Sequence, residues 1–93
     1  MTSAIAIPAD PDDPDDFDVT EAALERAYMG RRVRKLRNRL GMTQQEFAKV
    51  FGIPANSIRQ YEIGRYMPPP AVRAYLKVIE MEPEMVKRVM GAQ

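Results

Sequence analysis

Hydrophobic residues recur at helical spacing through most of the chain. Val33, Leu36 and Leu40 lie three and four residues apart, which places them on one face of a helix over residues 31–40. Further apolar faces of this kind occur at Phe47, Ala48 and Phe51, at Ile58 and Tyr61, at Ala71, Ala74, Tyr75, Leu76, Val78 and Ile79, and at Met85, Val86, Val89 and Met90. The pattern predicts an all-α fold with five helices in its core.

Residues 43–64 carry the strongest local signals. Thr43 and Glu46 form the sequence of a capping box at a helix start, and Gly52 ends that helix. Pro54 suits the first position of a second helix, which is predicted to end at Gly64. Two short helices joined by such a turn make a helix-turn-helix, whose second helix enters the DNA major groove.

The segment resembles the phage repressor and Cro type of helix-turn-helix regulator, the XRE family. The matching residues are Gln44, Glu46, Ala48, Gly52, Ile58, Glu62 and Gly64. Residues 68–86 are similar to the C-terminal part of HigA-type and MqsA-type antitoxins, with a proline-rich turn, a fourth helix and a Pro-Glu start to the fifth. The resemblance implies a lambda-repressor-like DNA-binding domain.

The resemblance also assigns roles to individual residues. The base-contacting positions fall on Ala55, Asn56 and Gln60, with Ser57 and Arg59 beside them. Asn and Gln pair with adenine, Arg pairs with guanine, and an Ala methyl touches a thymine methyl. Ala55 is shorter than the polar residue often found there. Phosphate contacts are expected from Thr43, Gln44, Arg39 and Arg65, and a structural ion pair from Arg37 and Glu62.

The two ends of the folded part are less sharply defined by the sequence. Residues 1–17 repeat Pro and Asp, so we predict a disordered acidic arm ahead of a domain over residues 18–93. Asp18 or Thr20 would cap an extra N-terminal helix, which Gly30 would either break or bend. Residues 68–70 are all proline and predict a stiff, non-helical link before the fourth helix.

The charges are divided unevenly along the chain. Residues 1–25 contain eight acidic and no basic residues, whereas residues 26–93 contain all 14 basic residues and the other five acids, so the two parts carry −8 and +9. A basic domain suits DNA. The arm is open to three interpretations: a solubilising tail, a segment that covers this protein's own basic DNA face, or a segment that binds a basic partner.

These observations favour a sequence-specific DNA-binding transcriptional repressor. We expect it to act as a homodimer on a palindromic operator, with the fourth and fifth helices forming the dimer contact. As an antitoxin it would bind a small basic toxin and repress its own operon. A stand-alone phage-type regulator and a protein-interaction module that uses the fold as a scaffold are the alternatives. The chain has no Cys and no His, so we expect no enzyme activity, cofactor or metal. No apolar run is long enough for a membrane span, and the expected location is the cytoplasm.

Overall fold

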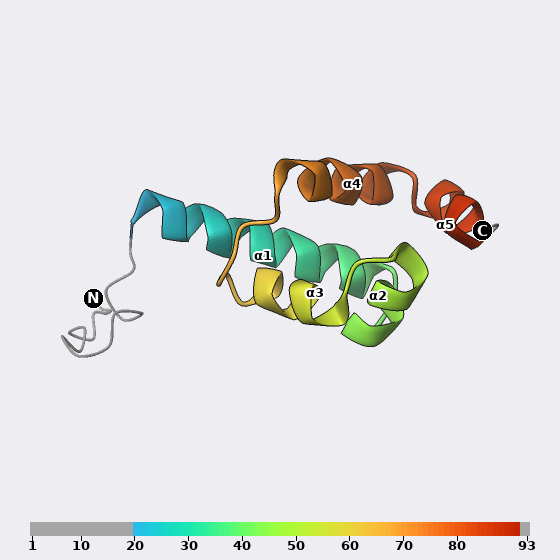
Figure 1. The fold of residues 1–93 in the computed structure, drawn as a ribbon, viewed down its shortest axis with the longest axis horizontal. Coiled ribbons are helices and arrows are strands. Elements are labelled where there is room, and N and C mark those ends of the chain that lie inside the picture. Colours follow the sequence, from blue (N-terminus) through green and yellow to red (C-terminus); the bar gives the residue numbers. More distant parts are fainter. Residues whose placement is uncertain (1–19, 92–93) are drawn as a thin grey trace.

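The computed structural model describes residues 20–91, which form five α-helices and no strand (Figure 1). The helices are α1 (Glu21–Arg39), α2 (Gln44–Phe51), α3 (Ala55–Glu62), α4 (Pro70–Met81) and α5 (Pro83–Gly91). The predicted all-α fold is confirmed. The arm over residues 1–17, the candidate cap Asp18 and residues 92–93 lie outside the described residues.

The extra N-terminal helix is not a separate element, because α1 runs without a break from Glu21 through Gly30 to Arg39. Thr20 caps it by accepting a hydrogen bond from the Ala23 N–H at 3.1 Å. Gly30 is buried where α1 crosses the end of α3. A Cβ atom there would collide with the Tyr61 carbonyl oxygen. Glycine at this position therefore lets two helices approach closely, and the sequence alone had left its role open.

Helices α2 and α3 form the helix-turn-helix. Thr43 and Glu46 make both hydrogen bonds of the capping box, at 3.0 and 2.8 Å, and Gly52 ends α2 with φ of 75°. Pro54 precedes α3 as its N-cap and is not its first helical residue, because its ψ of 137° is extended. Helix α3 ends at Glu62, two residues earlier than predicted, and Gly64 with φ of 77° turns the chain away.

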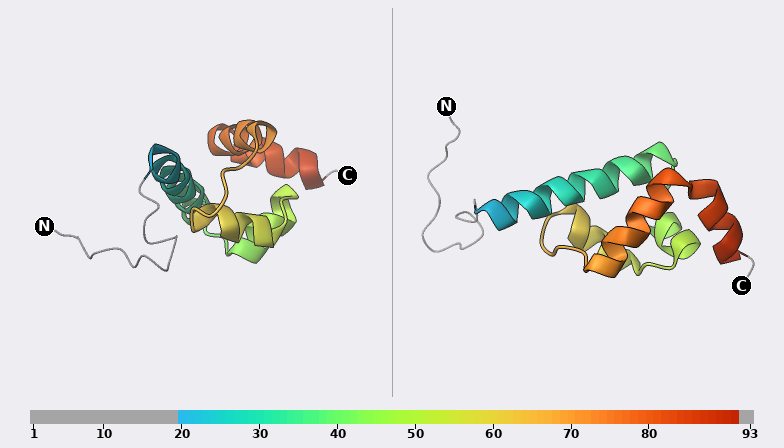
Figure 2. Two further views of the ribbon diagram at one scale, coloured as in Figure 1. Left: turned by 60° about the vertical axis from the view of Figure 1, so that its left-hand side comes forward. Right: turned by 90° about the horizontal axis from the view of Figure 1, so that it is seen from above.

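All five helices contribute to one hydrophobic core, and the views in Figure 2 show α1, α3 and α4 around a common interior. Phe47 and Phe51 are fully buried, with ring centroids 4.7 Å apart. Within residues 20–91, the core contains the buried residues Val33, Leu36, Phe47, Phe51, Ile53, Ile58, Tyr61, Leu76, Ile79 and Val86. Most of the apolar residues predicted from helical spacing pack in this core, but Ala71, Ala74, Val78 and Val89 are exposed, because the apolar faces of α4 and α5 are wider than the surface that the other helices cover.

The proline-rich link is shorter than predicted. Pro70 is the first residue of α4, where a missing N–H costs nothing, so only two of the three prolines precede the helix. Pro83 begins α5, as expected. At the other end of α4, Arg39 donates a hydrogen bond to the Glu80 carbonyl oxygen at 2.8 Å, which fastens α4 to the end of α1.

Candidate nucleic-acid interface

Helix α3 has one buried face and one polar face. Ile58, Tyr61 and Glu62 point into the protein, whereas Asn56 and Arg59 are exposed. The other predicted base-contacting residues, Ala55, Ser57 and Gln60, are partly exposed. The five predicted residues thus share the outer side of one short helix.

Asn56 and Arg59 contact each other across one turn of α3. The Arg59 Nη2 atom donates a hydrogen bond to Asn56 Oδ1 at 2.8 Å. This bond occupies the oxygen that an adenine N6 group would use, although a carbonyl oxygen accepts two hydrogen bonds. The two side chains therefore form one polar unit, and both must be considered when its base preference is tested.

Gln60 is held differently from its neighbours. Its Oε1 atom is buried and has no hydrogen-bond partner in the part of the chain that the structure describes. It lies beside a shallow pocket of about 300 Å³ that Asn56, Tyr66 and Met67 also line. Tyr66 is 59% exposed and is not among the site residues predicted from the sequence. Tyr66 could have been selected from the sequence, because it is an aromatic residue just beyond the predicted recognition helix.

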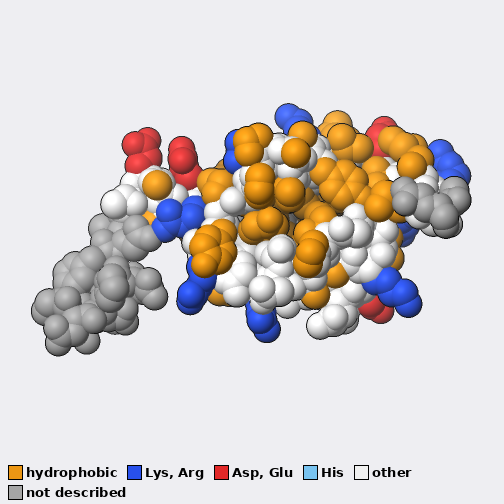
Figure 3. Space-filling model, in the orientation of Figure 1, with side chains coloured by type: hydrophobic (Ala, Val, Ile, Leu, Met, Phe, Trp, Pro, Cys, Tyr) orange, Lys and Arg blue, Asp and Glu red, His pale blue; other side chains and the backbone are white. Residues whose placement is uncertain are grey.

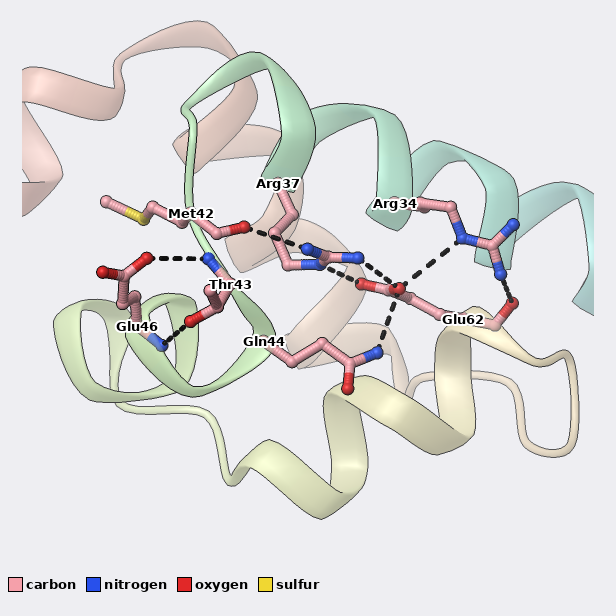
Figure 4. A network of polar contacts seen from close by, with 7 residues as sticks. All are labelled: Arg34, Arg37, Met42, Thr43, Gln44, Glu46 and Glu62. Carbon is pink, nitrogen blue, oxygen red and sulfur yellow. Dashed lines mark hydrogen bonds and ion pairs between the residues drawn. The ribbon is translucent and has the colours of Figure 1, made fainter.

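Glu62 ties α3 to both helices that precede it (Figure 4). Its side chain is 2% exposed and makes two bonds with Arg37, of 2.7 Å to Nε and 3.0 Å to Nη2. Gln44 Nε2 donates to the same carboxylate at 3.1 Å, and Arg34 Nε lies 3.7 Å away. The expected ion pair between Arg37 and Glu62 is present, and it belongs to a network that joins α1, α2 and α3.

The network lowers the pKa of Glu62. Burial alone would raise this pKa, but hydrogen bonds from Arg37 and Gln44 and the charges of Arg37 and Arg34 outweigh burial and bring it below its ordinary value. The Arg37 pKa moves in the opposite direction, because the hydrogen bond to Glu62 favours the charged guanidinium. Both groups are therefore charged at neutral pH.

Two arginines of α1 that the sequence analysis did not assign contact the end of α3. Arg34 Nη2 donates to the Glu62 carbonyl oxygen at 3.3 Å, and Arg26 Nε donates to the Gly64 carbonyl oxygen at 3.0 Å. Cations at a helix C-terminus stabilise its unpaired carbonyl groups and the negative end of its dipole. Arg34 lies three residues before Arg37 and therefore on the same side of α1. From this spacing its contact with the end of α3 could have been predicted.

The predicted phosphate contacts separate into two groups. Gln44 and Arg39 have partners within the protein, since Gln44 donates to Glu62 and Arg39 donates to the Glu80 carbonyl oxygen. Thr43 is exposed and occupied with the capping box of α2, while Arg65 is exposed just beyond α3. Of the two arginines, Arg65 is therefore better placed for a phosphate beside α3.

A capped helix, a tight turn and a short helix with a polar outer face follow one another in α2 and α3. This arrangement defines the class of protein as a helix-turn-helix domain of the kind used by DNA-binding regulators. The family model described as a helix-turn-helix domain matches residues 29–89, more than half of the chain, and the chain belongs to this XRE-type family.

The chain is also similar to one curated protein of known role. The antitoxin MqsA of Escherichia coli (strain K12) is 33% identical over 55 residues, which are 59% of this chain and 42% of MqsA. The chain thus spans less than half the length of this relative. A comparison with solved structures found no match.

Two further properties hold for residues 20–91. None of the helices there is both long and apolar enough to cross a membrane. The same residues contain no group of three or more His, Cys, Asp or Glu side chains placed to hold a metal ion.

Proposed function

We propose that this protein is a sequence-specific transcriptional repressor that reads operator DNA with the outer face of α3. The observation that carries the proposal is the exposed Asn56–Arg59 pair on a helix whose opposite side is fixed by buried Glu62. Asn and Arg are the residue types that pair with adenine and guanine edges in the major groove. A rigid helix holds them in register, and the basic charge of residues 26–93 attracts the phosphate backbone.

The repressor would bind as a homodimer. One recognition helix covers a half-site, and dimers of helix-turn-helix proteins place two such helices about 34 Å apart on a palindromic operator. Exposed hydrophobic side chains on α4 and α5, namely Val78, Met81 and Val89, supply a candidate dimer surface. Figure 3 shows hydrophobic side chains gathered over α4.

Within this class we favour an antitoxin that represses its own operon. The similarity to the antitoxin MqsA supports this choice, and so does the acidic N-terminal arm, whose charge suits a small basic toxin. A gene for a small basic protein beside this one would support the antitoxin role, and its absence would favour a stand-alone regulator.

The direct test is binding to the DNA upstream of the protein's own gene. At about 0.15 M salt a specific repressor binds its operator typically 10³–10⁷ times more tightly than random duplex. We expect a single protected region with two-fold symmetry in a footprinting experiment. Equal affinity for the upstream DNA and for a scrambled duplex would contradict autoregulation, and absence of any selected sequence from a random DNA pool would contradict specific repression altogether.

A further inference from the structure

A groove made of two neighbouring hollows lies along α1 on the side where α4 packs. Its first part, of about 590 Å³, lies beside the start of α1 and is lined by Leu24, Tyr28 and Met67. Its second part, of about 260 Å³, lies between α1 and α4. Met29 and Arg73 line both parts, so the two parts are neighbours. Helices α1 and α4 converge towards Arg39 and Glu80 and diverge towards the start of α4 (Figure 2, right).

The charges around this groove change along its length. Glu21 and Glu25 stand at the beginning, next to the exposed apolar side chains. Arg32, Arg73 and Lys77 line the remainder together with Glu80. Arg32 already pairs with Glu80 at 3.2 Å, whereas Arg73 and Lys77 take part in no ion pair among residues 20–91. The groove thus presents an apolar end followed by a cationic end with an apolar floor.

We propose that the acidic segment of this same chain, residues 10–17, binds in the groove. This segment contains five aspartates and ends in Phe17, three residues before the cap of α1. The sequence of apolar and acidic residues in this segment matches the groove if the segment runs antiparallel to α1. Phe17 meets the apolar end, and the aspartates lie beyond the acidic pair Glu21 and Glu25, beside Arg73 and Lys77.

The lengths also agree. From Leu24 to Leu36 the helix rises about 18 Å, at 1.5 Å per residue. The seven residues from Phe17 back to Asp10 span about 23 Å when extended. Two prolines within that stretch favour an extended backbone and reduce the entropy lost on binding. The three peptide bonds from Phe17 to Thr20 reach about 10 Å, enough to place Phe17 beside Leu24.

The groove adjoins the predicted DNA-binding face at Met67, which lines both the first part of the groove and the pocket beside Gln60. None of the predicted base-contacting residues lines it, and its walls come from α1, α4 and the link before α4. An arm bound there covers Lys77 and Arg73 and leaves α3 accessible. The inference is independent of the proposed function, because it depends only on how the arm and the groove complement each other.

Paramagnetic labelling of the full chain tests this inference. The chain has no Cys, so Ala9→Cys introduces a single nitroxide site and keeps every acidic residue. We expect the strongest broadening at the amide signals of residues 33–36 and 74–80, with weaker broadening at the outer face of α3. Lys77→Glu in the labelled chain should abolish this broadening. Lys35→Glu, the same charge change at an exposed α1 position outside the groove, should preserve it.

Three results would overturn the inference. Broadening concentrated on α3 would place the arm on the DNA face, and broadening that Lys77→Glu leaves intact would remove the role of the cationic end. The third result comes from a mixture of two kinds of chain: ¹⁵N-labelled chains without cysteine, and chains that carry the nitroxide but no ¹⁵N. Groove broadening in that mixture would assign the site to the arm of a second copy. Circular dichroism of each variant at the same salt concentration confirms that the helices are intact.

Discussion

Arg37 and Glu62 form a two-bond ion pair between α1 and the recognition helix, with Nε 2.7 Å from Oε2 and Nη2 3.0 Å from Oε1. The Glu62 side chain is 2% exposed and the Arg37 side chain 15% exposed, so the pair is shielded from solvent. Arg37 also donates to the Met42 carbonyl oxygen at 2.9 Å, which extends the contact to the chain that leads into α2. The pair therefore fixes the position of α3 relative to the rest of the domain.

Glu62→Gln should destabilise the protein strongly. The substitution leaves the Arg37 charge buried without a counterion, and breaking a buried pair in this way costs about 3 kcal/mol of unfolding free energy. Urea denaturation followed by circular dichroism measures the change. Glu80→Gln removes the exposed pair with Arg32 and serves as the control, with an expected loss below about 1 kcal/mol. Equal losses in the two variants would show that burial of the Glu62 pair contributes nothing.

The same pair predicts how stability depends on pH. The Glu62 pKa is lower in the folded protein than the ordinary value of 4.5, so its stabilisation is complete above that value and is lost as pH falls towards the folded pKa. The unfolding free energy of the parent protein should therefore fall more steeply below pH 4.5 than that of Glu62→Gln. Denaturation curves at a series of pH values from 6 downwards provide the comparison. Parallel curves would mean that Glu62 titrates alike in both states.

Gly30→Ala should destabilise the domain although alanine is the better helix former by about 1 kcal/mol. The new Cβ atom would collide with the Tyr61 carbonyl oxygen and lie 2.7 Å from that of Glu62, so α3 must move away from α1. We expect a net loss of about 1–3 kcal/mol. Gly91→Ala is the matched control, because nothing lies within 4 Å of a Cβ atom there. A stabilised Gly30→Ala variant would contradict the close approach of the two helices.

The helix-turn-helix could be predicted from sequence because its signals are local. Thr43 and Glu46 are three residues apart, and Gly52 needs a positive φ at a chain reversal, so both act within the segment that they define. The role of Gly30 could not be read in this way. Its neighbours Tyr61 and Glu62 are about thirty positions further along the chain, and a glycine in a helical pattern is equally consistent with a break.

The candidate site also combines features that local sequence signals predict with features that only the packing of distant segments determines. The outward direction of Asn56 and Arg59 follows from the periodicity of α3, with Ile58 and Tyr61 inside. The partners of Gln44, Arg39 and Arg26 depend on how helices pack in three dimensions, and no spacing in the sequence specifies them. As a result, two residues expected at phosphates have partners within the fold, and two unassigned arginines stabilise the end of the recognition helix.

The central claim is that the outer face of α3 reads bases, and the affinity of an Asn56→Ala, Gln60→Ala variant for the selected operator tests it most directly. Loss of a bidentate contact between Asn56 and adenine should alone cost about 1–3 kcal/mol, so operator binding should weaken at least about fivefold at about 0.15 M salt, whereas affinity for scrambled duplex stays the same. Asn38→Ala, the same change on an exposed position of α1, should bind the operator like the parent protein. Unchanged operator affinity in the double variant would contradict the claim.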